Sequence, residues 1–167
     1  MNTVWSLDPI YKGLDDPAYE ADVQASEQLV KEYAEVVSAA QKAENVEDYI
    51  EKLLLLEEEM SLKLYSLHLY LMLRQSVDQE NGEVMAQSNR VNKILASSAP
   101  SSAAAEKIYA QITDIDALAA KSEVVKAYTF KLKETKESAK YLLSDDVEEM
   151  ISAMNMTGGG ARGQLQS

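Results

Sequence analysis

Apolar residues are densest between positions 62 and 73, where only Lys63, Ser66 and His68 interrupt an apolar or aromatic run. At 3.6 residues per turn the run forms two neighbouring stripes on one helix. The first stripe contains Leu62, Tyr65, Leu69, Met72 and Leu73, and the second contains Leu64, Leu67 and Leu71. A helix that is apolar around most of its circumference needs neighbours on several sides. The pattern therefore predicts a long central helix over about residues 46–78, with the other helices packed around it.

Capping residues predict where the first three helices begin. Asp16 followed by Pro17 is typical of a helix start, and apolar spacing continues that helix to about residue 40. Asn45 can cap the central helix. The run from residue 78 to 82 is rich in turn formers, and within it Asn81 can cap the next helix, which places Val84, Ser88, Val91 and Leu95 on one face.

The second half of the chain predicts shorter helices. Pro100 predicts a kink or a break, followed by a new helix capped by Ser101 or Ser102. Ser122 predicts another start, with Val125, Tyr128, Leu132 and Thr135 facing inward. Ser144 predicts the last, with Val147, Met150, Ile151 and Met154 on one face. The fold expected is all-α, an antiparallel helical bundle or hairpin array of about five to six helices around the central one.

The domain organisation follows from the same pattern. Residues 1–156 are predicted to form a single α-helical domain, with residues 1–15 as an extended lead-in. Residues 157–167 have the glycine-rich composition of a linker or tail. An end of this kind is expected for a chain cut at a domain boundary or for a naturally short relative.

Composition excludes several function classes. With 28 acidic against 16 basic residues the net charge is −12, which argues against nucleic-acid binding. The run from residue 62 to 73 is shorter than the ~18–20 apolar residues that cross a bilayer, so no membrane partner is expected. The N-terminus lacks the pattern of a signal peptide, and there is no cysteine. We therefore expect a cytoplasmic protein.

The chain offers little chemistry of its own. Its single histidine, His68, lies between two leucines and is expected in the core or at a helix interface. A ferritin-like di-iron site needs two Glu-x-x-His pairs, and a His-Glu-x-x-His zinc site needs two histidines. No nucleophile motif is present, and the acidic run 57–59 is expected to be a solvated helix face. No catalytic, cofactor-binding or metal-binding residue is predicted.

Three stretches have a familiar order and spacing. They are Trp5-Ser6-Leu7-Asp8 with Ile10-Tyr11 and Asp15-Asp16; Leu69-Tyr70-Leu71 with Leu73-Arg74, Val77-Asp78 and Asn81; and Tyr128, Leu132, Leu142-Leu143-Ser144, Val147-Glu148, Gly159-Gly160-Ala161 and Leu165-Gln166. Together they resemble the N-terminal helical domain of bacterial oligoendopeptidase F and its relatives among the thimet-type zinc metallopeptidases.

The resemblance implies a non-catalytic domain of a longer peptidase. In that family two histidines of a downstream His-Glu-x-x-His motif and a distal glutamate hold the zinc, and none of these residues is in this sequence. Cofactors are therefore expected only in a catalytic domain that the sequence does not contain. The family's N-terminal helices form one wall of a channel that admits short peptides, so the implied partners are the catalytic domain of the same polypeptide and an oligopeptide substrate.

Two hypotheses follow. If the chain packs on a catalytic domain, it should expose an apolar patch, for which Trp5, Tyr11 and the face of residues 150–154 are candidates. The alternative is a free-standing α-helical interaction module or homodimer without enzymatic activity. The amphipathic, tyrosine-rich and acidic helices are compatible with both, and the sequence leaves homo-oligomerisation open.

Overall fold

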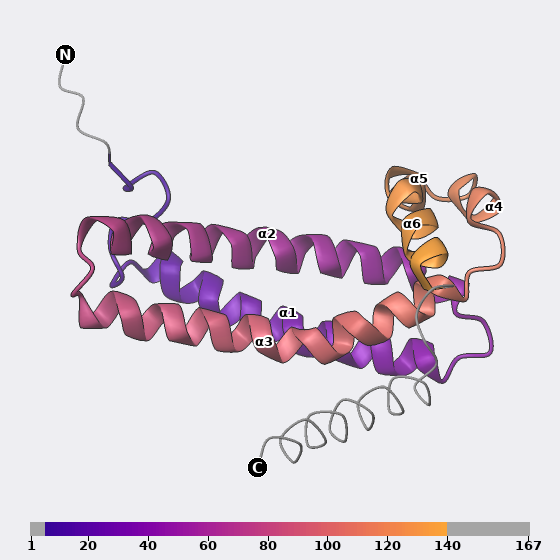
Figure 1. Cartoon of the computed structure of the whole chain (residues 1–167), viewed down its shortest axis with the longest axis horizontal. Coiled ribbons are helices and arrows are strands. Elements are labelled where there is room, and N and C mark those ends of the chain that lie inside the picture. The colour runs from indigo at the N-terminus through magenta and orange to yellow at the C-terminus, as the bar shows by residue number, and fades with distance from the viewer. Residues whose placement is uncertain (1–5, 140–167) are drawn as a thin grey trace, which may run out of the picture.

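Three long helices lie side by side and make up most of the computed structural model, which describes residues 6–139 (Figure 1). They are α1 (Pro17–Gln41), α2 (Glu47–Val77) and α3 (Gly82–Ala110), and each contacts the other two. Three short helices, α4 (Ile115–Ala119), α5 (Glu123–Ala127) and α6 (Thr129–Ala139), gather beyond the end of α3. The described residues contain these six helices and no strand, so the predicted all-α fold is confirmed.

Side-chain caps start these helices at the predicted positions. Asp16 accepts a hydrogen bond from the amide of Ala18 at 2.9 Å, and Asn81 accepts from two amides at the start of α3. The Ser122 hydroxyl accepts from the amide of Val125 at 3.2 Å and so caps α5. Each cap satisfies amides that have no partner inside the helix. At the start of α2, Asn45 accepts from the amide of Glu47 at 3.2 Å, but the N-cap position is held by Val46, so the predicted cap lies one residue too early.

The core lies between the three long helices. The second predicted stripe of α2 is buried there, because Leu64, Leu67 and Leu71 are at most 4% exposed. Four tyrosines are the largest fully buried side chains, namely Tyr19, Tyr33, Tyr70 and Tyr109. Each such ring removes a large apolar area from water and is a major contributor to the core.

Tyr11 fixes the lead-in to the bundle. It is 5% exposed, and its ring meets those of Tyr19 and Tyr70 edge-on, with centroids 5.4 and 5.0 Å away. Its hydroxyl donates to Asp22 of α1 at 2.8 Å. The expectation that Tyr11 belongs to an exposed apolar patch is therefore wrong. The edge-on ring contacts and the removal of apolar area from water favour burial of this side chain over exposure.

An ion pair joins α1 to α2 at the same place. Lys63 donates to Asp22 at 2.9 Å. Burial alone would raise the pKa of Asp22, but the hydrogen bonds from Lys63 and Tyr11 and the charge of Lys63 together lower it below its ordinary value. The carboxylate is therefore held in its charged form by contacts that exist only in the folded chain.

Of the kink or break predicted at Pro100, the break is wrong. α3 continues through this residue from Gly82 to Ala110, and no new helix starts at Ser101 or Ser102. Proline removes one backbone hydrogen bond, at a cost of ~3 kcal/mol. Buried residues lie on both sides of it, including Ile94 before it and Ile108 after it. Because tertiary packing supplies most of the stability of a helix in a protein, the packed face outweighs the local cost.

The helix predicted after Ser122 is divided in two. α5 ends at Ala127, and α6 begins at Thr129 after Tyr128 leaves the helical conformation. Val125 and Leu132 are nevertheless buried, as their spacing predicted. The helix predicted after Ser144 lies outside the described residues.

We expect Pro100→Ala to raise the free energy of unfolding by about 1–3 kcal/mol, because alanine restores an amide donor and removes a ring clash in a continuous helix. Urea unfolding of both proteins measures the difference. Ser101→Ala, one position further along the same helix, is the matched control and should change the free energy by less than about 0.5 kcal/mol. A Pro100→Ala variant less stable than the parent would mean that the packing of α3 needs the proline.

The lowered pKa of Asp22 predicts sensitivity to acid. A carboxylate whose pKa is lowered by folding stabilises the protein above its unfolded value, about 3.9, and this stabilisation is lost as the pH falls through the folded value. The free energy of unfolding should therefore decrease on acidification below about pH 4. Asp22→Asn and Lys63→Gln should each make that decrease shallower, as measured by urea unfolding over a pH series. A slope unchanged in both variants would contradict the role of this pair.

Candidate interaction surface

The first predicted stripe of α2 faces outward. Leu62, Tyr65 and Met72 are 62%, 65% and 49% exposed, while Leu69 and Leu73 are half-buried. The expectation that other helices also cover this side of α2 is not met within residues 6–139. The reason is that α1 and α3 both pack toward the opposite stripe, which leaves these five residues on the outer face of α2. We call them the α2 stripe.

A groove follows the stripe between α2 and α3. Its main hollow has a volume of about 380 Å³, with Met60, Leu64 and Tyr65 on one wall and Val91, Leu95 and Ser98 on the other. A smaller hollow of about 110 Å³, which also contains His68 and Val91, extends it past Met72 and Asn92. Leu95, half exposed on α3, faces the stripe across the hollow. The two hollows form one elongated depression, the α2–α3 groove.

The groove is almost free of charge, although the chain as a whole is strongly acidic. Glu57, at one end, is the only Asp, Glu, Lys or Arg among the residues that line its two hollows. On the α3 side the lining is small or amidic, with Ser88, Asn92, Ser98 and Ser102. Depletion of charge together with apolar and aromatic side chains is the compositional mark of the centre of a protein interface. The arrangement is therefore suited to contact with another apolar surface.

His68 lies at the edge of this groove and is exposed. The prediction that it is a core or helix-interface residue is wrong. It is located on the side of α2 that faces α3 but beyond the buried Leu64 and Leu71, so its ring reaches solvent. Among residues 6–139 no group of metal-ligating side chains forms around it.

The acidic end of the groove is tied to the short helices. The Glu57 carboxylate accepts hydrogen bonds from the Tyr109 hydroxyl at 3.0 Å and from Lys131 of α6 at 2.6 Å. Burial raises the pKa of Tyr109 well above its ordinary value, and the charge of Glu57 raises it further. Glu57 thus joins α2, α3 and α6, and the expectation that it belongs to a solvated helix face is wrong. Glu58 and Glu59 of the same run are exposed, as predicted.

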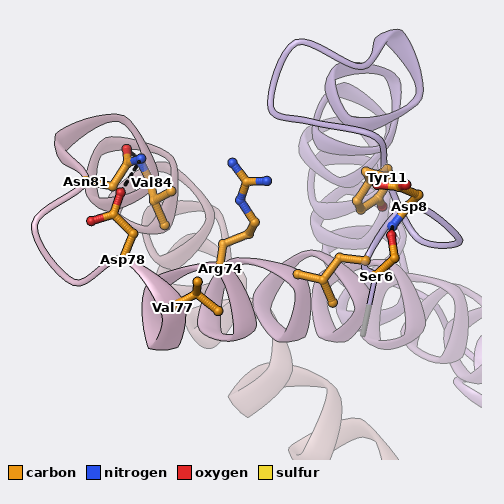
Figure 2. A pocket seen from close by; sticks show the side chains of 9 residues that line it. Ser6, Asp8, Tyr11, Arg74, Val77, Asp78, Asn81 and Val84 are labelled. Carbon is orange, nitrogen blue, oxygen red and sulfur yellow. Dashed lines mark hydrogen bonds between the residues drawn. The ribbon is translucent and has the colours of Figure 1, made fainter. Parts of the chain in front are cut away.

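A separate pocket, not connected with the α2–α3 groove, opens at the opposite end of the bundle. Figure 2 shows the Arg74 side chain between the lead-in and the turn that joins α2 to α3, in a pocket of about 390 Å³. Asp8 and Asp78 lie on either side of it, and Asp78 accepts from Asn81 at 3.2 Å. Arg74 is in the last turn of α2, where a positive charge interacts favourably with the helix dipole. The carboxylates around it make this pocket unsuited to anions.

The described residues do not fit a zinc site. Across residues 6–139 no three His, Cys, Asp or Glu side chains come together so that they could hold a metal ion. The zinc that the family resemblance implies therefore has no ligand set in this part of the chain. Within the same residues no helix has the length and hydropathy to cross a membrane.

The remaining patch candidates, Trp5 and residues 150–154, lie outside the described residues. Two other large apolar residues, Leu95 and Phe130, are exposed, and the sequence pattern did not predict this. For Leu95 a usable signal was the run from 96 to 105, ASSAPSSAAA, which contains small residues and none of the charged residues typical of a solvated face.

A family model described as oligopeptidase F matches residues 112–167, the last third of the chain. The match begins directly after α3, and its described part contains α4, α5 and α6. The comparisons with curated proteins and with solved structures gave no significant match.

Residues 112–167 are similar to the oligopeptidase F family model, and the described part of that segment is α-helical. The resemblance to the N-terminal domain of an oligoendopeptidase F-like enzyme is thereby confirmed, on the evidence of residues 112–167.

Two tyrosines give a matched test of the polar network. Tyr109→Phe should lower the free energy of unfolding by about 1–2 kcal/mol, because the hydroxyl bonds to a charged partner in the core. Tyr70→Phe makes the same chemical change where the buried hydroxyl has no hydrogen-bond partner, so it should leave stability unchanged or increase it. Denaturant unfolding compares the two. A loss for Tyr70→Phe as large as that for Tyr109→Phe would contradict the assigned role of Glu57.

Proposed function

We propose that the chain is the N-terminal, non-catalytic helical domain of a zinc-dependent oligoendopeptidase. The observation that carries this proposal is the match of residues 112–167 to the oligopeptidase F family. The parent reaction would be the hydrolysis of short peptides by a zinc-bound water in a catalytic domain. This chain would supply no ligand and no general base, but would help to shape the path of the peptide.

The domain would form one wall of the peptide channel and pack on the catalytic domain of the same polypeptide in the cytoplasm. Two features support a packed position for the α4–α6 end. Phe130 of α6 is 79% exposed, within the matched segment. Leu62 and Tyr128 line a further hollow of about 240 Å³ between α2 and the short helices. Exposed aromatic side chains are typical anchors at a domain interface.

The second candidate function is a free-standing interaction module or homodimer. The observation that favours it is the exposed α2 stripe, which provides a helix face for a partner without any catalytic domain. Sedimentation velocity separates the two: a stable dimer of this chain alone would support the second candidate, and a monomer that binds a catalytic domain would support the first.

The first experiment is to mix the chain with a separately expressed catalytic half of a related oligoendopeptidase. Calorimetry measures the association, and a quenched fluorescent peptide reports hydrolysis. We expect binding together with restored or altered cleavage. Phe130→Ser should weaken binding by about tenfold or more, because loss of an interface aromatic commonly costs over 1–2 kcal/mol.

Val77→Ser is the matched control. Val77 is 86% exposed, but it ends α2 at the other end of the bundle from α6 (Figure 1). Its replacement should leave the association unchanged. The absence of any association, for a chain that is folded and stable, would refute the proposal.

A further inference from the structure

We propose that the α2–α3 groove binds a short peptide in extended conformation, with apolar side chains in the hollows and positively charged groups at the two ends. The groove would be the part of the channel wall that the peptide touches, so the choice of a peptide as the ligand rests on the proposed function. The length of the groove, its free polar groups, its apolar walls and the charges at its ends each support this ligand.

The groove has the length of a short extended peptide. Its lining runs along α2 from Glu57 to Gln75, which is 18 residue steps (75 − 57), or about 27 Å at 1.5 Å per residue. An extended chain advances ~3.3 Å per residue, so about eight residues would fill this length. The hollow beside Tyr128, which shares Glu57 and Ser61 with the main hollow, continues the groove toward the short helices. A peptide in the groove would therefore lead to the end of the domain that we propose to pack on the catalytic domain.

Free polar side chains favour an extended peptide over a helix as the ligand. Asn92 and Gln75 line the smaller hollow from α3 and α2, and neither side chain makes a hydrogen bond within residues 6–139. The same is true of the hydroxyls of Ser61 and Ser88. A helix satisfies its backbone groups internally, whereas an extended chain has amides and carbonyls that need partners. Amide and hydroxyl side chains can bind both kinds of group.

The walls of the main hollow are suited to apolar side chains. Leu64 and Val91 are buried there, and Tyr65 and Leu95 are 65% and 51% exposed on its two sides. Covering these groups removes apolar surface from water, which is the main favourable contribution to most protein association. Tyrosine is among the residues whose loss weakens an interface most. Tyr65 is therefore expected to contribute strongly to the affinity for a peptide.

Acidic residues lie at both ends of the groove. Glu57 and Glu58 line the hollows at the end nearest the short helices. Glu80 and Glu83 are exposed in the turn and at the start of α3, beyond the end of the smaller hollow. A peptide with apolar residues in its centre and a positive charge at each end has the complementary distribution of charge.

The nearest cations do not remove this acidic character. Lys131 binds Glu57 at 2.6 Å and so offsets one of the two carboxylates at its end. Arg74 is directed to the separate pocket beside the lead-in (Figure 2). The chain as a whole has a net charge of −12, so it would attract a cationic peptide and repel a second copy of itself.

The test uses the isolated chain and a fluorescently labelled peptide of about eight residues, with lysine at each end and leucine and phenylalanine between. Fluorescence anisotropy should show saturable binding. The same peptide with glutamate in place of both lysines should bind about tenfold more weakly or less, because its charges would face the acidic ends of the groove. Far-UV circular dichroism of the mixture should show no gain of helix.

Tyr65→Ser locates the binding site. It should weaken binding of the lysine peptide about tenfold, because it removes an exposed aromatic ring from the wall of the main hollow. Phe130→Ser is the matched control, since it removes an exposed aromatic ring that does not line the groove. It should leave peptide binding unchanged.

Three results would overturn the proposal: no saturable binding, equal binding of the lysine and glutamate peptides, or binding that Tyr65→Ser does not weaken. A gain of helical signal on binding would overturn the extended conformation. A dimer of the chain that Tyr65→Ser dissociates, with no peptide binding, would also overturn the proposal and would make a second copy the ligand.

Failure of this proposal can be distinguished from failure of the proposed function, because the two binding surfaces are different. Tyr65→Ser should weaken peptide binding and leave the association with the catalytic half unchanged, and Phe130→Ser should do the reverse. A chain that binds the catalytic half but not the peptide would refute only the peptide site in the groove. A chain that binds the peptide but no catalytic half would uphold the site and refute the proposed function.

Discussion

The burial of one face of α2 against both α1 and α3 is the interaction on which the other parts of the structure depend. Leu64, Leu67 and Leu71 are enclosed by the two neighbours, and each such side chain contributes roughly 1.5–3 kcal/mol relative to exposure. Once that face is fixed, the position of every other residue of α2 is fixed with it. The α2 stripe is outside for this reason, and Glu57 is directed to the end where the short helices attach.

Acidic residues of α2 bond to the region of the short helices. Glu47 accepts from the amide of Thr113 at 3.3 Å, Glu51 accepts from the Ser122 hydroxyl at 2.7 Å, and Glu57 accepts from Lys131. These three carboxylates are in the first third of α2. The bundle thus serves as a support for α4–α6, which make up the described part of the segment that matches the oligopeptidase F family.

Helix starts could be predicted from the sequence because a cap is local: Asp16, Asn81 and Ser122 bond to amides two or three residues ahead. The continuity of α3 through Pro100 and the exposure of Tyr65 and His68 could not, because they depend on which helices pack where. Periodicity shows which residues share a face, but it does not show how many neighbours cover that face. The nearly uncharged groove was not predicted for the same reason, since its two walls come from residues of α2 and α3 that are about thirty positions apart in the sequence.

The way the chain is connected also has a kinetic consequence. The helices α4 and α5 have five residues each and α6 has 11, and helices this short are not stable in water without tertiary packing. Their region is bonded to α2 through Glu47, Glu51 and Glu57. The helices α4–α6 can therefore dock only after α2 has formed. They would be the first part to open in local unfolding, which hydrogen exchange would detect as weaker protection of their amides than of those in α2.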